Sequence, residues 1–415
     1  MMPATLASSD SRREPRRRPG TTAAGHVLLA LLSRIERGRL EVHAPDGRIH
    51  RFGPGEYAAD GTPLPAAVLR IVDWRAARAA LASGDVGFAE SYMAGHWTTP
   101  DLVALLTLLA ANQPSLERAF YGRAWARGLL RLRHWLNANT RRQARKNIAA
   151  HYDLGNDFYA LWLDRSMTYS SALFEGVGSR SLEAAQQAKY DRALAELELA
   201  PGSHVLEIGC GWGGFAETAA REGHRVTGIS LSERQTAWAR ERLARAGLYD
   251  RVELRLQDYR DARGRHDGVA SIEMIEAVGE KYWPAYFGAV RDALVAGGRA
   301  CIQAITIAEA RFARYRTQSD FIQQYIFPGG MLLSPARLVE EGERAGLRLV
   351  RSHRFGRDYA ETLRRWLVAF DAQAGAIAAR FDERFVRCWR FYLAYCAAGF
   401  DTDTTDVGQY TFARA

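Results

Sequence analysis

Residues 203–214, Ser203-His-Val-Leu-Glu-Ile-Gly-Cys-Gly-Trp-Gly-Gly214, decide the fold of this chain. Val205, Leu206 and Ile208 make a short apolar run that predicts a buried parallel strand. The run stops at a glycine cluster, and a helix-like stretch follows over residues 215–221. Glycines let the backbone approach a ligand closely, and the N-terminus of a helix offers free N–H groups. The stretch therefore predicts a strand, a loop and a helix that bind a nucleotide-type ligand.

Two cofactors compete for this loop. Gly209, Gly211 and Gly214 satisfy the G-x-G-x-x-G pattern of dinucleotide binding, but alone that match is weak. A dinucleotide site also needs an acidic residue about 20 positions further on, for the ribose. Here the next strand, 224–229, ends in Ser-Leu-Ser without an acid at its end. Glu207 instead completes the E-x-G-x-G-x-G form of S-adenosylmethionine (SAM) methyltransferases, so the sequence favours SAM over NAD. A glycine turn without a ligand remains the alternative.

Bulk composition narrows the classes of partner and compartment. The chain has 415 residues and a net charge of +9, which favours an acidic partner, either nucleic acid or an anionic membrane surface. No apolar stretch reaches the length of a membrane span. Five arginines between residues 12 and 18 precede the apolar run 23–32, as in a signal peptide, but no small-residue cleavage site follows. The four cysteines lack C-x-x-C spacing, so neither a metal site nor a disulfide framework is expected, and a cytoplasmic protein fits.

Composition along the chain predicts four parts. Residues 1–24 are a basic tail, and 25–112 alternate strand-like and helix-like segments, as in a small α+β domain. An aromatic-rich stretch within this second part, 84–99, fits either core packing or a lipid-contacting surface. Residues 113–147 are rich in Arg and Lys with interleaved Leu and Trp, which is typical of an interfacial membrane helix and equally of a plain linker helix. Residues 148–415 form the largest part.

Strands and helices alternate from residue 203 onward, and this alternation predicts an α/β fold with a doubly wound, Rossmann-like sheet and helical additions. Ligands of such sheets lie at the carboxyl ends of the strands. Those ends define one crevice, formed by 209–213, 230–232, 257–259, 273–276 and 303–306. An insertion over 311–342 is apolar and aromatic, which suits either a lid over a greasy substrate or a packed extra helix.

Several longer motifs resemble the cyclopropane-fatty-acyl-phospholipid synthase family of SAM-dependent enzymes, over about residues 25–412. The motifs are 151–159, 205–214, 226–235, 273–279, 320–331 and 358–363. The resemblance implies an N-terminal lipid-associating domain and a SAM-dependent methyltransferase domain. It implies transfer of a methylene group to the cis double bond of an unsaturated acyl chain in membrane phospholipid, with a bicarbonate ion as base.

The resemblance also assigns site residues. The SAM contacts that it implies are His151, Tyr169, Ser170, Gly209, Gly211, Ser230, Gln235 and Tyr259. The bicarbonate pocket and catalytic residues that it implies are Ser171, Glu276, Gln303 and Tyr359. Glu276 lies at a strand end in the crevice, so it is the protein carboxylate expected to act as base or to orient the ion; a solvated or helix-capping glutamate is the alternative. The rings of Tyr169, Tyr325 and Tyr359 are expected to face a carbocation on the chain.

The sequence departs from the family pattern at two of these positions. Many members carry Cys where this chain has Ser171, and His where it has Gln303. Serine still offers a backbone group and a hydroxyl, whereas glutamine cannot carry a proton or a positive charge, which weakens an anion site built on imidazole. Two products remain open for this reason: a cyclopropane ring, or a methyl- or methylene-branched chain formed when the same cation loses a different proton.

Two other classes of protein stay as alternatives. A non-catalytic lipid-binding protein that keeps the fold is disfavoured by the intact glycine loop, Gln235 and Glu276. A nucleic-acid methyltransferase is permitted by the charge, but the apolar stretch 321–332 suits an acyl chain better than a flipped base. We therefore expect a cytoplasmic enzyme that associates peripherally with anionic lipids on the inner face of the membrane and binds no nucleic acid. A homodimer is left open.

Overall fold

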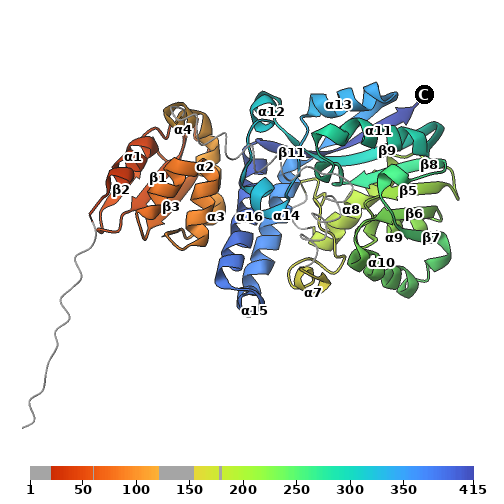
Figure 1. Cartoon of the computed structure of the whole chain (residues 1–415), viewed down its shortest axis with the longest axis horizontal. Helices are drawn as coiled ribbons and strands as arrows, with labels where there is room; N and C mark the ends of the chain where they lie inside the picture. Colours follow the sequence, from red (N-terminus) through yellow and green to blue (C-terminus); the bar gives the residue numbers. More distant parts are fainter. Residues whose placement is uncertain (1–19, 59, 121–153, 177–179) are drawn as a thin grey trace, which may run out of the picture.

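The computed structural model describes residues 20–58, 60–120, 154–176 and 180–415 (Figure 1). Most of the predicted tail, 1–24, and most of the predicted basic segment, 113–147, lie outside these residues, and the first helix begins at Ala23, within the predicted tail. Within them, no helix is both long enough and apolar enough to cross a bilayer.

The N-terminal part, coloured red to orange in Figure 1, is a four-stranded sheet covered by helices. Its strand order is β2-β1-β3-β4, with β1 antiparallel to β2 and parallel to β3. The elements are α1 (Ala23–Leu32), β1 (Arg39–His43), β2 (Ile49–Phe52), β3 (Ala66–Ile71), α2 (Arg75–Met93), β4 (Trp97–Thr98), α3 (Leu102–Ala111) and α4 (Gln113–Phe120). Side chains at the helix starts satisfy free N–H groups, as where Thr22 accepts a hydrogen bond from Gly25 N and Asp101 accepts one from Ala104 N. The mixture of strands and helices agrees with the α+β domain expected for residues 25–112.

The C-terminal part is a seven-stranded sheet with the order β10-β11-β9-β8-β5-β6-β7, parallel throughout except for β11. The sheet is therefore doubly wound about β5, the strand that the quoted sequence predicts. Its strands are β5 (His204–Ile208), β6 (Arg225–Ser230), β7 (Val252–Leu256), β8 (His266–Ile272), β9 (Leu294–Ile307), β10 (Leu347–Arg354) and β11 (Thr405–Arg414). The strands β10 and β11 were not predicted from the sequence.

Helices cover both faces of this sheet, and each face has its own hydrophobic cluster. The helices α8, α9 and α10 bury apolar residues with one face, and α11 and α13 with the other. Their bounds are α8 (Leu182–Ala195), α9 (Gly214–Arg221), α10 (Glu233–Arg245), α11 (Trp283–Ala293) and α13 (Pro335–Arg344). Between them lie the short helices α7 (Asn156–Tyr159), η1 (Tyr249–Arg251), η2 (Tyr259–Asp261), η3 (Ile275–Ala277) and η4 (Glu280–Tyr282).

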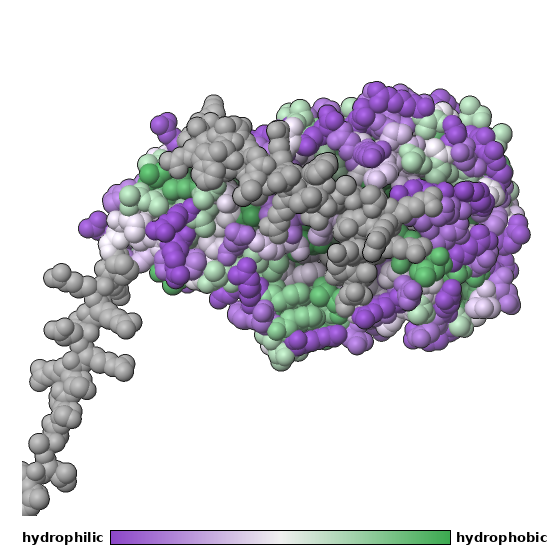
Figure 2. All heavy atoms as spheres, in the orientation of Figure 1, coloured by the Kyte–Doolittle hydropathy of each residue, from purple (hydrophilic) through white to green (hydrophobic). Residues whose placement is uncertain are grey.

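The remaining helices join the two parts of the molecule. The insertion after β9 forms α12 (Glu309–Tyr315) and a π-helix, η5 (Ile322–Ile326), and the C-terminal helices are α14 (Gly356–Ala372), α15 (Ala374–Arg380) and α16 (Glu383–Asp401). Figure 1 shows α14 and α16 standing between the two sheets. Apolar residues gather on the surface around α15, at the tip of this helix pair (Figure 2).

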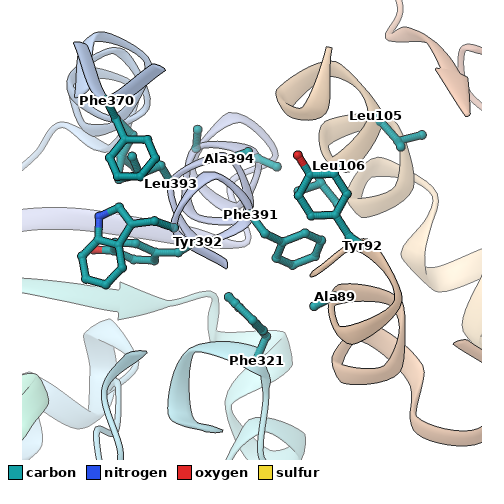
Figure 3. Packing of buried hydrophobic residues seen from close by; sticks show 14 of the residues in the cluster. Ala89, Tyr92, Leu105, Leu106, Phe321, Phe370, Phe391, Tyr392, Leu393 and Ala394 are labelled. Carbon is teal, nitrogen blue, oxygen red and sulfur yellow. The ribbon is translucent and has the colours of Figure 1, made fainter. Parts of the chain in front are cut away.

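One hydrophobic cluster runs from the N-terminal helices through α16 to α14. Figure 3 shows Phe391 of α16 pointing between Tyr92 of α2 and Phe321, with the Phe391 ring centroid 5.9 Å and 4.9 Å from theirs. Trp97 is fully buried and stacks on Phe88. The aromatic-rich stretch 84–99 is therefore mainly core packing, the first of the two interpretations that the sequence allowed.

Candidate active site

The glycine loop has the geometry that a cofactor needs. Gly209 and Gly211 have φ of +85° and +49°, in the left-handed region that favours glycine. A Cβ on Gly211 would meet no atom within 4 Å, so the backbone there borders open space. Glu207, at the end of β5, is buried, and its Oε2 accepts no hydrogen bond within the described residues. Burial raises the pKa of Glu207 to about 8.

The other expected SAM contacts surround this loop. Ser230 and Gln235 are buried at the end of β6 and the start of α10, where Gln235 N donates to the capping Ser232. Tyr259 follows β7. These residues lie at the carboxyl edge of neighbouring strands, as predicted. The open space beside Gly211 and the Glu207 oxygen without a partner among the described residues fit a SAM molecule bound at this edge. His151 lies outside the described residues.

Aromatic rings connect Tyr169 to the glycine loop. The ring of Tyr159 is 5.3 Å from that of Tyr169 and 5.3 Å from that of Trp212. Trp212 Nε1 donates to Asn156 Oδ1 at 2.9 Å, which fixes the loop against α7. Tyr169 also shares a 2.7 Å hydrogen bond with Tyr392 of α16. Tyr169 is therefore held between the cofactor loop and the C-terminal helices.

Three of the four expected catalytic residues converge on one carboxylate, which belongs to Glu273. Its Oε1 accepts from the backbone N of Ser171 at 2.9 Å and from Gln303 Nε2 at 2.8 Å. Its Oε2 accepts from the hydroxyl of Tyr359 at 2.7 Å. Sequence reasoning did not single out Glu273 as a functional residue. Its position directly after β8, within the motif that contains Glu276, was the signal that could have identified it.

The backbone of Glu273 is strained. Its φ is +50°, a conformation that non-glycine residues seldom adopt and that costs about 1–3 kcal/mol. The backbone N–H of Glu273 donates to Gln303 O at 2.8 Å, and the three side-chain hydrogen bonds hold the carboxylate. Burial raises the pKa of Glu273, while these donors and Lys189 oppose the rise. Such strain at a carboxylate that lines a cavity is typical of a functional position.

Glu276 lies beside this group but bonds elsewhere. Its Oε1 accepts from Ile305 N at 2.6 Å, and its buried Oε2 has no hydrogen-bond partner among the described residues. Burial, and secondly the neighbouring Glu273, raise the pKa of Glu276 to about 8. This raised pKa favours the protonated form of Glu276. Ser171, Gln303 and Tyr359, which we expected to share a bicarbonate pocket with Glu276, donate to Glu273 instead.

The hydrogen bonds of Gln303 explain why a glutamine suits this position. It pairs with Gln409 across β9 and β11, and its Oε1 accepts from Gln409 Nε2 at 3.1 Å. Its Nε2 is thereby turned toward Glu273. An amide supplies a donor and an acceptor at any pH, so the glutamine that replaces the usual histidine matches a carboxylate fixed in the chain.

A cavity of about 1520 Å³ opens onto Glu273 and Glu276. It exceeds the roughly 300–1,000 Å³ of a typical small-molecule site, and most of its walls are apolar. Helices α1, α2, α3 and α4 supply one side, the insertion supplies another, and α16 supplies a third. At the inner end lie the rings of Tyr169, Tyr359 and Tyr392. Tyr325 is not among the lining residues, and its hydroxyl donates to Glu90 of α2, whereas Tyr392 does line the cavity.

Comparison with known proteins places this geometry in a family. The family model described as mycolic acid cyclopropane synthetase matches residues 139–410. Tuberculostearic acid methyltransferase UfaA1 of Mycobacterium tuberculosis is 40% identical over 95% of this chain and 93% of its own length. Cyclopropane-fatty-acyl-phospholipid synthase of Escherichia coli is 32% identical over 90% of this chain and 96% of its own.

Solved structures agree with the sequence relatives. Mycolic acid cyclopropane synthase CmaA1, complexed with SAH and CTAB, superposes with a TM-score of 0.61 at 31% identity. The superposition covers 65% of this chain and 98% of that one. The cyclopropane synthase MmaA2 of M. tuberculosis gives the same TM-score at 30% identity. This chain therefore belongs to the mycolic acid cyclopropane synthetase family and is a SAM-dependent lipid methyltransferase.

Proposed function

We propose that this enzyme methylates the cis double bond of an unsaturated acyl chain in membrane phospholipid, and that Glu273 then removes a proton from the resulting carbocation. The observation that carries the proposal is the Glu273 carboxylate at the inner end of the apolar cavity, held by Ser171, Gln303 and Tyr359. Bound SAM supplies an electrophilic methyl group. The protein supplies the position of the chain, the surroundings of the cation and the base.

Aromatic rings and apolar walls would support the first step. An alkene is a weak nucleophile, so the chain must be held in line with the methyl group, and such positioning supplies up to about 7–11 kcal/mol in favourable cases. The rings of Tyr169, Tyr359 and Tyr392 line the inner end of the cavity. Each would stabilise a cation over its face by about 0.5–2 kcal/mol. Apolar walls also keep out the water that would otherwise trap the cation as an alcohol.

Glu273 would take over the role that the family resemblance gave to bicarbonate. A bicarbonate ion is a small planar anion with carboxylate-like oxygens, and the donors expected to bind it already bind the Glu273 carboxylate. A second anion at the same donors would be repelled by the first. We therefore propose that catalysis needs no bicarbonate. Glu276, whose raised pKa favours its protonated form, would leave Glu273 as the ionised partner of the two.

Two products are compatible with this base. Loss of a proton from the added methyl group, with bond formation to the cationic carbon, closes a cyclopropane ring. A hydride shift to the cationic carbon followed by loss of the methyl proton gives a methylene branch instead. The ring corresponds to the E. coli relative's printed name. The open-chain product is favoured by the higher identity and coverage of the relative that is named a methyltransferase.

The membrane surface is the proposed source of the substrate. The chain carries a net charge of +9, and a basic residue near an anionic leaflet adds about 1 kcal/mol to binding. Binding should therefore weaken steeply with salt. Vesicles with and without anionic lipid, compared at rising salt, test this part of the proposal; salt-independent binding would contradict it.

Lipid analysis after expression tests the reaction. A host with unsaturated phospholipids should gain chains heavier by one CH₂ group when it expresses the wild type. The matched Glu273→Gln variant should yield none while still binding SAM, because the loss falls on a step after cofactor binding. NMR of the product separates a ring from a branch. Unmodified lipids with the folded wild type, or full activity of Glu273→Gln, would overturn the proposal.

A further inference from the structure

Lys189 is a buried cation that no part of the reaction above uses. It lies on α8, and its side chain has no solvent exposure. Its Nζ donates to Ser170 Oγ at 2.6 Å, and one turn earlier Gln186 Nε2 donates to Ser170 O at 2.9 Å. One face of α8 thus holds both polar groups of Ser170, a residue expected to contact SAM.

Among the residues that the structure describes, no direct ion pair neutralises the charge of Lys189. Within the described residues, no carboxylate approaches its Nζ to the 4.0 Å of a salt bridge, and the nearest ring, Tyr190, lies 4.0 Å from it. Three acidic residues face it from three different elements: Glu273 after β8, Asp164 after α7 and Glu207 in β5. Burial lowers the pKa of Lys189 to about 7, and these three acids oppose that shift.

Two structural routes connect Lys189 to Glu273. Ser170, which the ammonium group holds, is followed directly by Ser171, whose backbone N–H donates to Glu273. In addition, Gln409 Nε2 donates both to the backbone carbonyl of Lys189 and to Gln303 Oε1, at 3.1 Å each. The ammonium group of Lys189 therefore acts on one donor of Glu273 and the backbone carbonyl of Lys189 on a second.

We propose that Lys189 is a positioning residue: its ammonium group fixes Ser170 beside the cofactor and supplies the positive charge that keeps Glu273 ionised. The second half of this statement rests on the proposed role of Glu273 as base. A lysine fully buried without an ion pair is costly, and an apolar residue of the same shape would be more stable there. The retained charge therefore has a use in the reaction rather than in folding.

The groups around Glu273 determine in which direction its pKa changes when the charge of Lys189 is removed. Burial favours its protonated form, whereas Ser171, Gln303, Tyr359 and Lys189 favour the carboxylate. Loss of the ammonium group raises the pKa of Glu273. Since a base acts only when deprotonated, the acid limb of the pH–rate profile then moves to higher pH.

Two substitutions separate the hydrogen bond from the charge. Lys189→Met removes both, whereas Lys189→Gln keeps a donor for Ser170 and removes only the charge. Both variants should shift the acid limb of kcat upward by about 1 pH unit. Lys189→Met should also weaken SAH binding by about 2- to 12-fold, the value of one hydrogen bond, while Lys189→Gln stays near wild type. The exposed Lys281→Gln is the matched control and should change neither quantity.

The outcomes distinguish this proposal from its alternatives. If the acid limb of the pH–rate profile stays at the wild-type pH in both folded variants, Lys189 has no electrostatic role. If Lys189→Met binds SAH with unchanged affinity, Lys189 does not position Ser170 for cofactor binding. If Lys189→Met does not fold by circular dichroism, Lys189→Gln carries the pH test and Ser170→Ala the affinity test. Full turnover of Glu273→Gln would refute the base assignment, and the SAH measurement on Lys189 would still decide the positioning role.

Discussion

At the scale of single residues, two neighbouring carboxyl groups in the site differ in their hydrogen-bond donors. Glu273 is surrounded by donors, whereas Glu276 has one backbone donor and an oxygen without a partner among the described residues. Pairs of carboxyl groups whose pKa values are driven apart are a common acid–base arrangement. The sequence predicted Glu276 as the functional carboxylate at this strand end, whereas the hydrogen-bond donors surround Glu273. Spacing alone could not show that the backbone at residue 273 adopts φ of +50° and turns that side chain inward.

Glu276→Gln should make the free energy of unfolding depend less on pH. The pKa of Glu276 is raised from 4.5 to about 8 on folding, so the folded state binds more protons than the unfolded state between these values. Stability from this group is therefore present below pH 4.5 and is lost as pH rises to 8, with a slope of at most about 1.4 kcal/mol per pH unit. Denaturant titrations at several pH values should show a shallower decline for Glu276→Gln than for the wild type.

The exposed Glu222→Gln serves as the control for this titration and should keep the wild-type slope. Equal slopes for the wild type and Glu276→Gln would show that Glu276 titrates normally. The amide replaces a carboxyl whose raised pKa favours its neutral form, so we also expect Glu276→Gln to retain turnover within about tenfold, in contrast to Glu273→Gln.

At the scale of elements, the strand–glycine loop–helix unit could be predicted because its signals are local. The apolar run, the glycines and the helix that follows occur within twenty residues, and β5, β6 and β7 agree with the predicted segments. The strands β10 and β11 were missed because their pairing partners lie far away in sequence. Strand β11 pairs antiparallel with β9 from more than a hundred residues away, and its Gln409 completes the contacts of Gln303. That part of the site depends on sheet register, which local pattern does not fix.

Gly211→Val should abolish SAM binding while the protein remains folded. A β-branched residue is strained at φ of +49°, and its side chain would enter the open space that the cofactor is expected to occupy. Gly223→Val is a matched control, since Gly223 has φ of +89° and also borders open space, but at the end of α9. Calorimetry should detect SAM binding for Gly223→Val and none for Gly211→Val. Near-normal affinity of Gly211→Val would refute the cofactor site.

At the scale of the whole molecule, the active site is shared between two parts of the chain. The N-terminal helices form one side of the cavity, and α16 packs against α2 and α3 while it carries Tyr392 to the reaction end. The insertion, for which the sequence allowed either a lid or a packed extra helix, supplies another wall of the cavity. Sequence composition could suggest an apolar substrate, but it could not show that residues 23–116 and 305–332 enclose a common space.

Leu31→Trp should obstruct the acyl cavity from its N-terminal side. Leu31 of α1 lines the cavity about 240 residues before Glu273 in sequence. The added volume should lower turnover on long acyl chains by about tenfold or more, because overpacking costs about 1–3 kcal/mol, while SAH binding stays unchanged. The exposed Val72→Trp in the same part of the chain is the control. Wild-type turnover of Leu31→Trp would mean that the substrate does not use this region.

The central claim is that a carboxylate built into the chain acts where a bicarbonate ion was expected, and the bicarbonate dependence of Glu273→Gly tests it most directly. Glycine suits φ of +50° and leaves the donors of Ser171, Gln303 and Tyr359 free to bind a small anion. Methyl transfer is measured on unsaturated phospholipid in buffer stripped of carbon dioxide, with and without added bicarbonate. We predict that the wild type is indifferent to bicarbonate and that the Glu273→Gly variant is inactive without the ion and regains turnover with it. A wild type that requires bicarbonate, or a Glu273→Gly variant active in its absence, would contradict it.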